Sequence, residues 1–181
     1  CSDRPKITYT NFLYVQLITD FIKSVIKQPT DVITSGLSGS FVVMACKNDT
    51  SIIRRIMMIN PEDLAVLNQI PDRRSKASKF LLELPLIGTL VYNILNSRPN
   101  IDLAFTEKYL HNPFHVDTEL EDLYYESAHL ENGAGKYLLA SITGKYIYCN
   151  ITRALKTIDN SIYILQGDSE PRARESVALY T

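Results

Sequence analysis

Residues 31–46 of this 181-residue chain read DVITSGLSGSFVVMAC, and this stretch is the most informative part of the sequence. Its first part, Asp31–Ser35, is rich in β-branched side chains and predicts a buried strand. Its last part, Phe41–Cys46, is apolar and predicts a buried helix. Between them lies Gly36–Ser40, where the glycines and serines favour a tight turn. The stretch therefore predicts a strand, a tight turn and a helix in direct succession.

The elements around this turn continue the alternation of helices and strands. Apolar residues recur at helical spacing over Thr10–Lys27, and Pro29 ends that helix. The second half of Ile52–Ile59 predicts a core strand, and Glu62–Ile70 predicts a short helix. Such alternation is typical of an α/β fold, with a mostly parallel sheet flanked by helices.

The middle of the chain is different in character, because it shows helical patterns and no convincing pair of strands. Helices are expected at Lys76–Leu84, Pro85–Leu95, Ile101–Leu110, Thr118–His129, Lys136–Ile142 and Asn150–Ile158. A strand returns at Ser161–Gln166, and a helix is expected from Pro171 to Tyr180. We therefore expect a sheet core over 1–71, a helical insertion over 72–158 and a return to the core over 159–181.

Composition and charge exclude several classes of function. Nineteen Lys and Arg against twenty Asp and Glu give a formal net charge of −1, which favours neither nucleic acid nor an anionic membrane as a partner. No segment approaches the ~20 apolar residues of a membrane span. The three cysteines are too few for a disulfide scaffold or a zinc cluster, and they fit the reducing cytoplasm. No metal-ligand spacing, Walker loop or dinucleotide fingerprint occurs, so no cofactor is expected.

Ser38 is the candidate nucleophile of the predicted turn. A nucleophile between a strand and a helix needs a strained backbone that holds its hydroxyl clear of the sheet. Gly36 and Ser40, two residues to either side, are small enough for the close approach of strand and helix. The backbone N–H of Gly39, at the helix start, could stabilise an oxyanion. An ordinary Gly/Ser-rich turn, or a phosphate or cofactor loop, is the alternative interpretation.

The segment Ser35–Ser40 resembles the nucleophile elbow of the α/β-hydrolases, in particular of bacterial esterase-like members with a helical cap. It departs from the pattern G-x-S-x-G at the last position, where Ser40 replaces glycine. Ile56–Pro61 resembles the next core strand of that family, and Ile162–Gly167 resembles the strand before its catalytic acid. The resemblance implies that 72–158 forms or includes a cap that shapes the substrate pocket.

The resemblance also implies the other members of a catalytic triad. The acid of the family commonly follows the later strand, where Glu170 stands here with Asp168 as its competitor. A solvated loop acid or a helix cap is the alternative role of either residue. The family order places the histidine after the acid, hence beyond Thr181. The three histidines present precede the acid and are expected to be structural residues of the middle helices: His111, His115 and His129. The alternative is that one of them enters the pocket from the cap, which would break the family order.

These expectations combine into one functional hypothesis with two alternatives. We expect a fragment, lacking both ends, of a serine hydrolase that acts on a small ester or acyl substrate. The first oxyanion loop would precede Cys1, so the 181 residues alone would show little turnover. A non-catalytic binding module with the same fold and an acyltransferase with the same nucleophile are the alternatives. The oligomeric state is not predicted.

Overall fold

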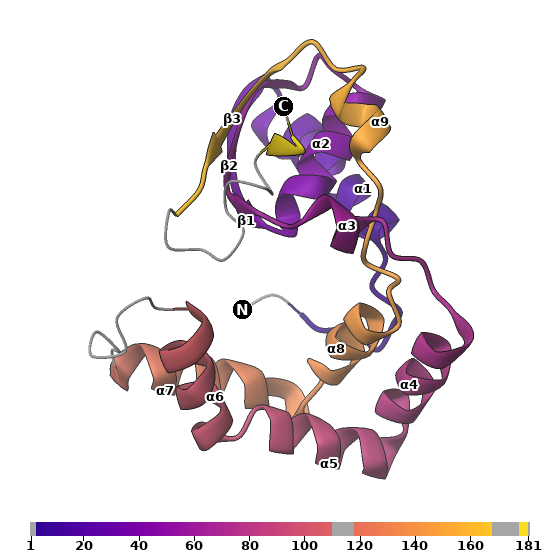
Figure 1. Ribbon diagram of the computed structural model, residues 1–181, viewed down its shortest axis with the longest axis vertical. Coiled ribbons are helices and arrows are strands. Elements are labelled where there is room, and N and C mark those ends of the chain that lie inside the picture. The colour runs from indigo at the N-terminus through magenta and orange to yellow at the C-terminus, as the bar shows by residue number, and fades with distance from the viewer. Residues whose placement is uncertain (1–2, 110–117, 168–177, 181) are drawn as a thin grey trace. The chain divides into compact units, whose positions relative to one another are not determined.

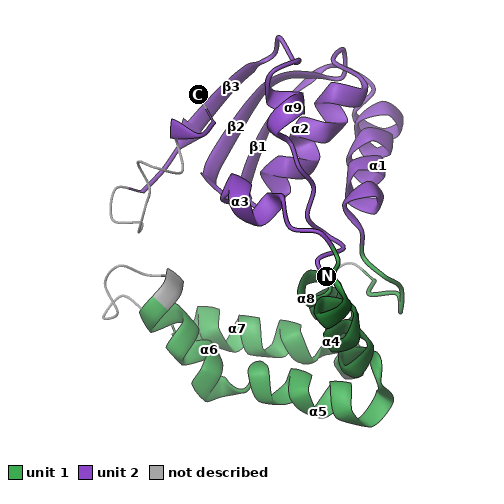
Figure 2. Cartoon of the chain, turned by 45° about the vertical axis from the view of Figure 1, so that its right-hand side comes forward, with its two compact units in different colours: residues 1–9, 71–144 green, residues 10–70, 145–181 purple. Residues whose placement is uncertain are grey.

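The chain divides into two compact units, and the computed structural model describes residues 3–109, 118–167 and 178–180 (Figure 2). The helical unit comprises residues 1–9 and 71–144, and the sheet unit comprises 10–70 and 145–181. These bounds differ from the sequence-based ones at two places. The Tyr9 backbone N–H donates to the Ser141 hydroxyl, which ties the N-terminal residues to the helical unit. The Asn11 side chain donates to the Tyr148 carbonyl, within the sheet unit.

The sheet unit is built on three parallel strands, in the order β1-β2-β3 (Figure 1). They are β1 (Thr30–Gly36), β2 (Ile53–Pro61) and β3 (Ser161–Leu165). In their register Ile33 lies beside Met57, and Met57 lies beside Tyr163. The predicted α/β fold class with a parallel sheet is therefore confirmed.

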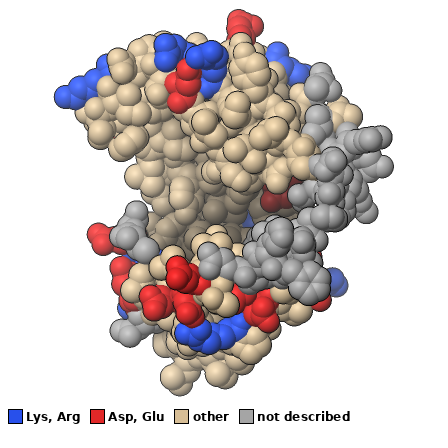
Figure 3. Space-filling model, turned by 90° about the vertical axis from the view of Figure 1, so that its left-hand side faces the viewer, with Lys and Arg blue, Asp and Glu red and all other residues tan. Residues whose placement is uncertain are grey.

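Helices cover one face of this sheet (Figure 1). They are α1 (Asn11–Phe21) with the π-helical turn Ile22–Ile26, α2 (Ser38–Asn48), α3 (Leu64–Leu67) and α9 (Thr152–Leu155). The core between α2 and the sheet consists of fully buried side chains: Val43, Cys46, Ile53, Ile56 and Met58. Figure 3 shows the sheet unit in the upper part of the picture. The side that faces the viewer there carries few charged residues except along its upper edge.

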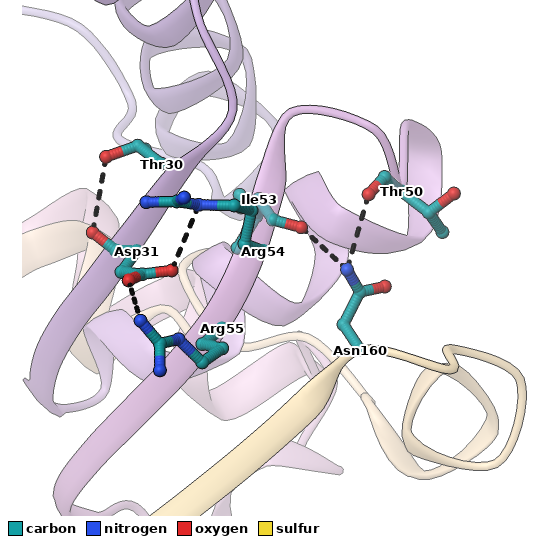
Figure 4. Close-up of polar contacts among 7 residues, drawn as sticks. All are labelled: Thr30, Asp31, Thr50, Ile53, Arg54, Arg55 and Asn160. Atoms are coloured by element: carbon teal, nitrogen blue, oxygen red, sulfur yellow. Dashed lines mark hydrogen bonds and ion pairs between the residues drawn. The ribbon is translucent and has the colours of Figure 1, made fainter.

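A polar cluster joins the strands at their amino ends (Figure 4). The Asp31 carboxylate, on β1, accepts from Arg55 at 2.6 Å and pairs with Arg54 at 3.4 Å, both on β2. The Arg55 hydrogen bond is the main cause that lowers the pKa of Asp31. The Asn160 side chain donates to the Ile53 carbonyl at 2.6 Å, which holds the start of β3 against β2. The candidate site lies at the opposite, carboxyl ends of the strands.

The helical unit consists of helices, two of which meet at a sharp bend. They are α4 (Arg73–Glu83), α5 (Pro85–Leu95), α6 (Arg98–Ala104) with the π-helical turn Phe105–Tyr109, α7 (Thr118–His129), the short 3-10 turn Leu130–Asn132 and α8 (Lys136–Thr143). The axes of α4 and α5 are bent by 96° relative to one another. Lys136, only 6% exposed, donates to the Leu84 carbonyl and the Thr89 hydroxyl and so ties α8 to this bend.

Acidification is expected to weaken the sheet unit through Asp49, which follows α2. Its carboxylate pairs with Lys23 at 2.7 Å and accepts from Ser51, and these contacts lower its pKa to about 2. A depressed carboxyl pKa contributes stability that is present above the unfolded-state value and lost as the pH falls toward the folded-state value. We expect the urea midpoint to fall between about pH 4 and pH 2, and Asp49→Asn to lack this part of the fall. An identical pH dependence in both proteins would contradict this assignment.

Candidate active site

The turn between β1 and α2 lies at the carboxyl end of the parallel sheet, where open α/β folds bind their ligands. Strand β1 ends at Gly36 and helix α2 begins at Ser38. Gly36 has a φ of +55°, in the left-handed region, and Leu37 already has helical dihedral angles (φ −58°, ψ −32°). The chain therefore reverses from strand to helix at Gly36, because glycine adopts this conformation at little steric cost.

The Ser38 hydroxyl is hydrogen-bonded back to the end of β1. Its Oγ donates to the Ser35 carbonyl at 2.6 Å and lies 2.5 Å from Oγ1 of the buried Thr34. Since the Ser38 proton goes to the carbonyl, the Thr34 hydroxyl is the donor in the second contact. Ser38 is partly exposed, but its oxygen is held against the strand.

The strained backbone expected at Ser38 is found at Gly36 instead. Ser38 is not among the described non-glycine residues with a positive φ, which are Lys27, Asn60, Glu131 and Lys145. A Cβ built on Gly36 would meet no atom within 4 Å. A side chain at position 36 would thus stand in open space at the strand end, which is the geometry that a nucleophile requires. The sequence was ambiguous here because small residues occur at both positions.

Gly39 is explained by packing in this structure. It is buried in the first turn of α2, and a Cβ built on it would lie 2.9 Å from Sδ of Met58, on β2. The absence of a side chain lets α2 approach the sheet closely. Its backbone N–H belongs to the first turn, whose N–H groups have no acceptor within the helix. An oxyanion role for that N–H stays a prediction.

The carboxyl ends of β2 and β3 are joined by a residue that the sequence analysis did not single out. Asn60 has a φ of +44°, and its Oδ1 accepts the Gly167 backbone N–H at 2.9 Å. An asparagine before Pro61 at a strand end is the sequence signal for such a turn. The two candidate acids, Asp168 and Glu170, follow this contact and lie outside the described residues.

The described histidine lies in the helical unit, and burial disfavours the thiolate form of the two described cysteines. Nδ1 of His129 lies 2.8 Å from the Tyr125 carbonyl, one turn earlier on α7 in the helical unit. Burial raises the pKa of the thiols of Cys46 and Cys149, which keeps both neutral. His111 and His115 lie outside the described residues. Among the residues described, no group of three His, Cys, Asp or Glu could hold a metal ion.

Comparison with known proteins identifies the fold. No protein-family model matches the sequence, and no curated protein matches it. A mutant of the meta-cleavage product hydrolase CumD is similar over 98% of this chain and 62% of its own, with 13% identity and a TM-score of 0.65. A carboxylesterase structure from the ammonia-oxidizing thaumarchaeon Nitrososphaera gargenis has 11% identity over 96% of this chain and 59% of its own, with a TM-score of 0.60. MGS-M2, an α/β-hydrolase enzyme from a deep-sea metagenome library of the Medee basin, has 11% identity over 97% and 61%, with a TM-score of 0.61.

These similarities show that the chain has part of the α/β-hydrolase fold, as the elbow-like turn and the strand order predict. The chain spans about 60% of the length of these three structures. At sequence identities of 11–13%, this structural similarity shows the fold alone, and any chemistry has to be argued from the site itself.

Proposed function

We propose that the protein binds a small acyl- or ester-type molecule at the turn between β1 and α2 and forms no covalent intermediate at Ser38. The observation that carries this proposal is the left-handed φ of +55° at Gly36, with open space where its side chain would be. The apex of the turn has the backbone of a nucleophile elbow and lacks a side chain. The α/β-hydrolase fold supports the choice of ligand class, by analogy with similar structures.

The hydrogen bonds of Ser38 support the same conclusion. Attack on a carbonyl would require the hydroxyl to leave the Ser35 carbonyl, at a net cost of about 1 kcal/mol for the hydrogen bond. The residue would also have to attack from the first turn of α2, with ordinary helical backbone, rather than from the apex of the turn. Ser38 thus serves to close the turn in this account.

Hydrolysis through Ser38 is the second candidate function, and one observation favours it. The Thr34 hydroxyl donates to Oγ of Ser38 at the amino end of α2, and both features would lower the cost of negative charge on that oxygen. In this alternative Glu170 or Asp168 orients a histidine beyond Thr181, as in a carboxylic ester hydrolase. Acyl transfer would use the same residues and a different acceptor.

Fluorophosphonate labelling of the intact protein separates the two candidates. We expect no adduct on the peptide that contains residues 31–46, as mapped by mass spectrometry, while circular dichroism shows a folded protein and a known serine hydrolase is labelled in parallel. Ser38→Ala should behave as the wild type does. An adduct on Ser38 that Ser38→Ala abolishes would establish the hydrolase candidate instead.

A binding measurement tests the positive half of the proposal. Gly36→Asn adds a side chain at the apex with a residue that tolerates a left-handed backbone. We expect it to weaken the binding of a short-chain acyl ester, measured by calorimetry, by about tenfold, or about 1.4 kcal/mol. Gly167→Asn, at an exposed glycine after β3, is the matched control and should bind as the wild type does. Equal affinity of all three proteins would contradict binding at the turn.

A further inference from the structure

Helix α5 presents an exposed apolar face in the helical unit. Its sequence, PLIGTLVYNIL, contains no charged residue. Three aliphatic side chains at helical spacing, Leu86, Leu90 and Ile94, are 85%, 62% and 56% exposed. The opposite side, with Gly88 and Tyr92, is buried in the unit. The helix therefore packs with its small and aromatic residues and leaves its large aliphatic residues uncovered.

The apolar surface continues around the bend onto the end of α4. Phe80 and Leu81, in the last turn of that helix, are 63% and 51% exposed. The neighbouring Glu83 is neutralised by an ion pair with Lys79 at 2.5 Å. We call Phe80, Leu81 and the exposed aliphatic residues of α5 the apolar bend; these residues are Leu86, Ile87, Leu90, Ile94 and Leu95.

Cations gather at the other end of α4. Arg73, Arg74 and Lys76 are exposed, and none of them forms an ion pair with a residue that the structure describes. At about 1.5 Å of rise per residue, Arg74 lies about 9 Å along the helix from Phe80. The helical unit thus carries an apolar surface and, about two turns of helix away, a group of free positive charges.

The angle between α4 and α5 determines how the apolar bend and the cations of α4 could contact the same surface. Because the axes of α4 and α5 are bent by 96°, α5 can lie flat in a plane while α4 rises out of that plane. An interfacial helix sinks its apolar face by about 5–10 Å into the boundary between acyl chains and headgroups. With α5 at that depth, the cations of α4 would be at the height of the lipid headgroups.

We propose that the apolar bend docks on an anionic lipid surface, with α5 in the plane of the interface and Arg73, Arg74 and Lys76 against the headgroups. The charges of α4 favour lipid over a purely apolar protein partner, because they complement anionic headgroups. No single helix among the described residues is long and apolar enough to cross a membrane, and the pair α4 and α5 meets that test only when taken together. The net charge of −1 disfavours an anionic membrane for the chain as a whole, but it does not show that cations are grouped locally on α4.

Vesicle co-sedimentation of the intact protein tests the proposal. We expect binding to vesicles of phosphatidylcholine mixed with an equal amount of phosphatidylglycerol, and much weaker binding to phosphatidylcholine alone or at high salt. Leu86→Ser and Leu90→Ser should each reduce the partition coefficient by about tenfold. Arg73→Gln and Arg74→Gln should each reduce it by about fivefold on anionic vesicles only.

The control is Leu123→Ser, which removes a leucine as exposed as Leu90 (61% against 62%) from α7, in the same unit but outside the apolar bend. It should bind vesicles as the wild type does. The proposal fails if the wild type stays in the supernatant, or if Leu123→Ser loses as much binding as Leu90→Ser. It also fails if sedimentation velocity shows that the wild type self-associates and Leu86→Ser is monomeric, since a second copy would then cover the face.

Discussion

Replacing Gly88 by alanine is expected to unfold the helical unit. Gly88 is buried in α5, and a Cβ built on it would lie 1.8 Å from the Leu82 carbonyl oxygen and 2.5 Å from the carbonyl carbon. Backbone atoms cannot yield as a flexible side chain can, so α4 and α5 would have to separate at their bend. We expect the free energy of unfolding of this unit to fall by about 3 kcal/mol or more.

Hydrogen exchange with mass spectrometry measures this effect for each unit separately. Peptides from 73–83 and 85–95 should lose protection in Gly88→Ala, while peptides from β1 and β2 keep it. Leu86→Ala, two residues earlier on the same helix and highly exposed, is the matched control and should leave protection almost unchanged. Protection equal to the wild type in Gly88→Ala would show that the bend does not depend on this close contact.

Replacing Gly39 by valine is expected to destabilise the sheet unit. This result would show that Gly39 is needed for packing, independently of an oxyanion role of its backbone N–H. The new side chain would overlap Met58, which is 1% exposed, and approach Thr34. Overpacking of a buried contact costs about 1–3 kcal/mol. An oxyanion donor acts through its backbone N–H, which the substitution keeps. We therefore expect a lower urea midpoint, even when no ligand is present.

The matched control for this variant is Gly167→Ala. Gly167 is exposed, and the nearest atom to a Cβ built on it is Oδ1 of Asn60 at 4.0 Å. Its urea midpoint should stay close to that of the wild type. If Gly39→Val were as stable as Gly167→Ala, the close approach of α2 to β2 would not be the reason for this glycine.

The fold could be predicted from the sequence wherever a local pattern specifies an element. The apolar and β-branched runs 31–35 and 52–59 correspond to β1 and β2, and the strand at 161–166 corresponds to β3. Asp72 and Ser75 form a capping box at the start of α4. Pro85 opens α5 at the position where proline is tolerated. In these segments local propensity and tertiary packing favour the same structure.

The candidate site could be predicted only as a segment, because its details depend on where one element ends. All residues of 35–40 except Leu37 are serine or glycine, so the sequence is compatible with an apex at either Gly36 or Ser38. The end of β1 at Gly36, paired with Pro61 of β2, decides between them. The contact of Asn60 with Gly167 could not be predicted either, because it depends on the pairing of strands that are more than a hundred residues apart in the sequence. The acids Asp168 and Glu170 stay predictions.

A crystal structure of the intact protein, at a resolution that fixes the backbone of residues 34–40, would show directly whether the apex of the turn is at Gly36 or at Ser38. The measured quantities are the φ angles of Gly36 and Ser38 and the partners of Oγ of Ser38. We predict a φ near +55° at Gly36, a helical Ser38, and a hydroxyl that donates to the Ser35 carbonyl. A positive φ at Ser38, with its hydroxyl directed away from the sheet, would contradict the account and restore Ser38 as the nucleophile.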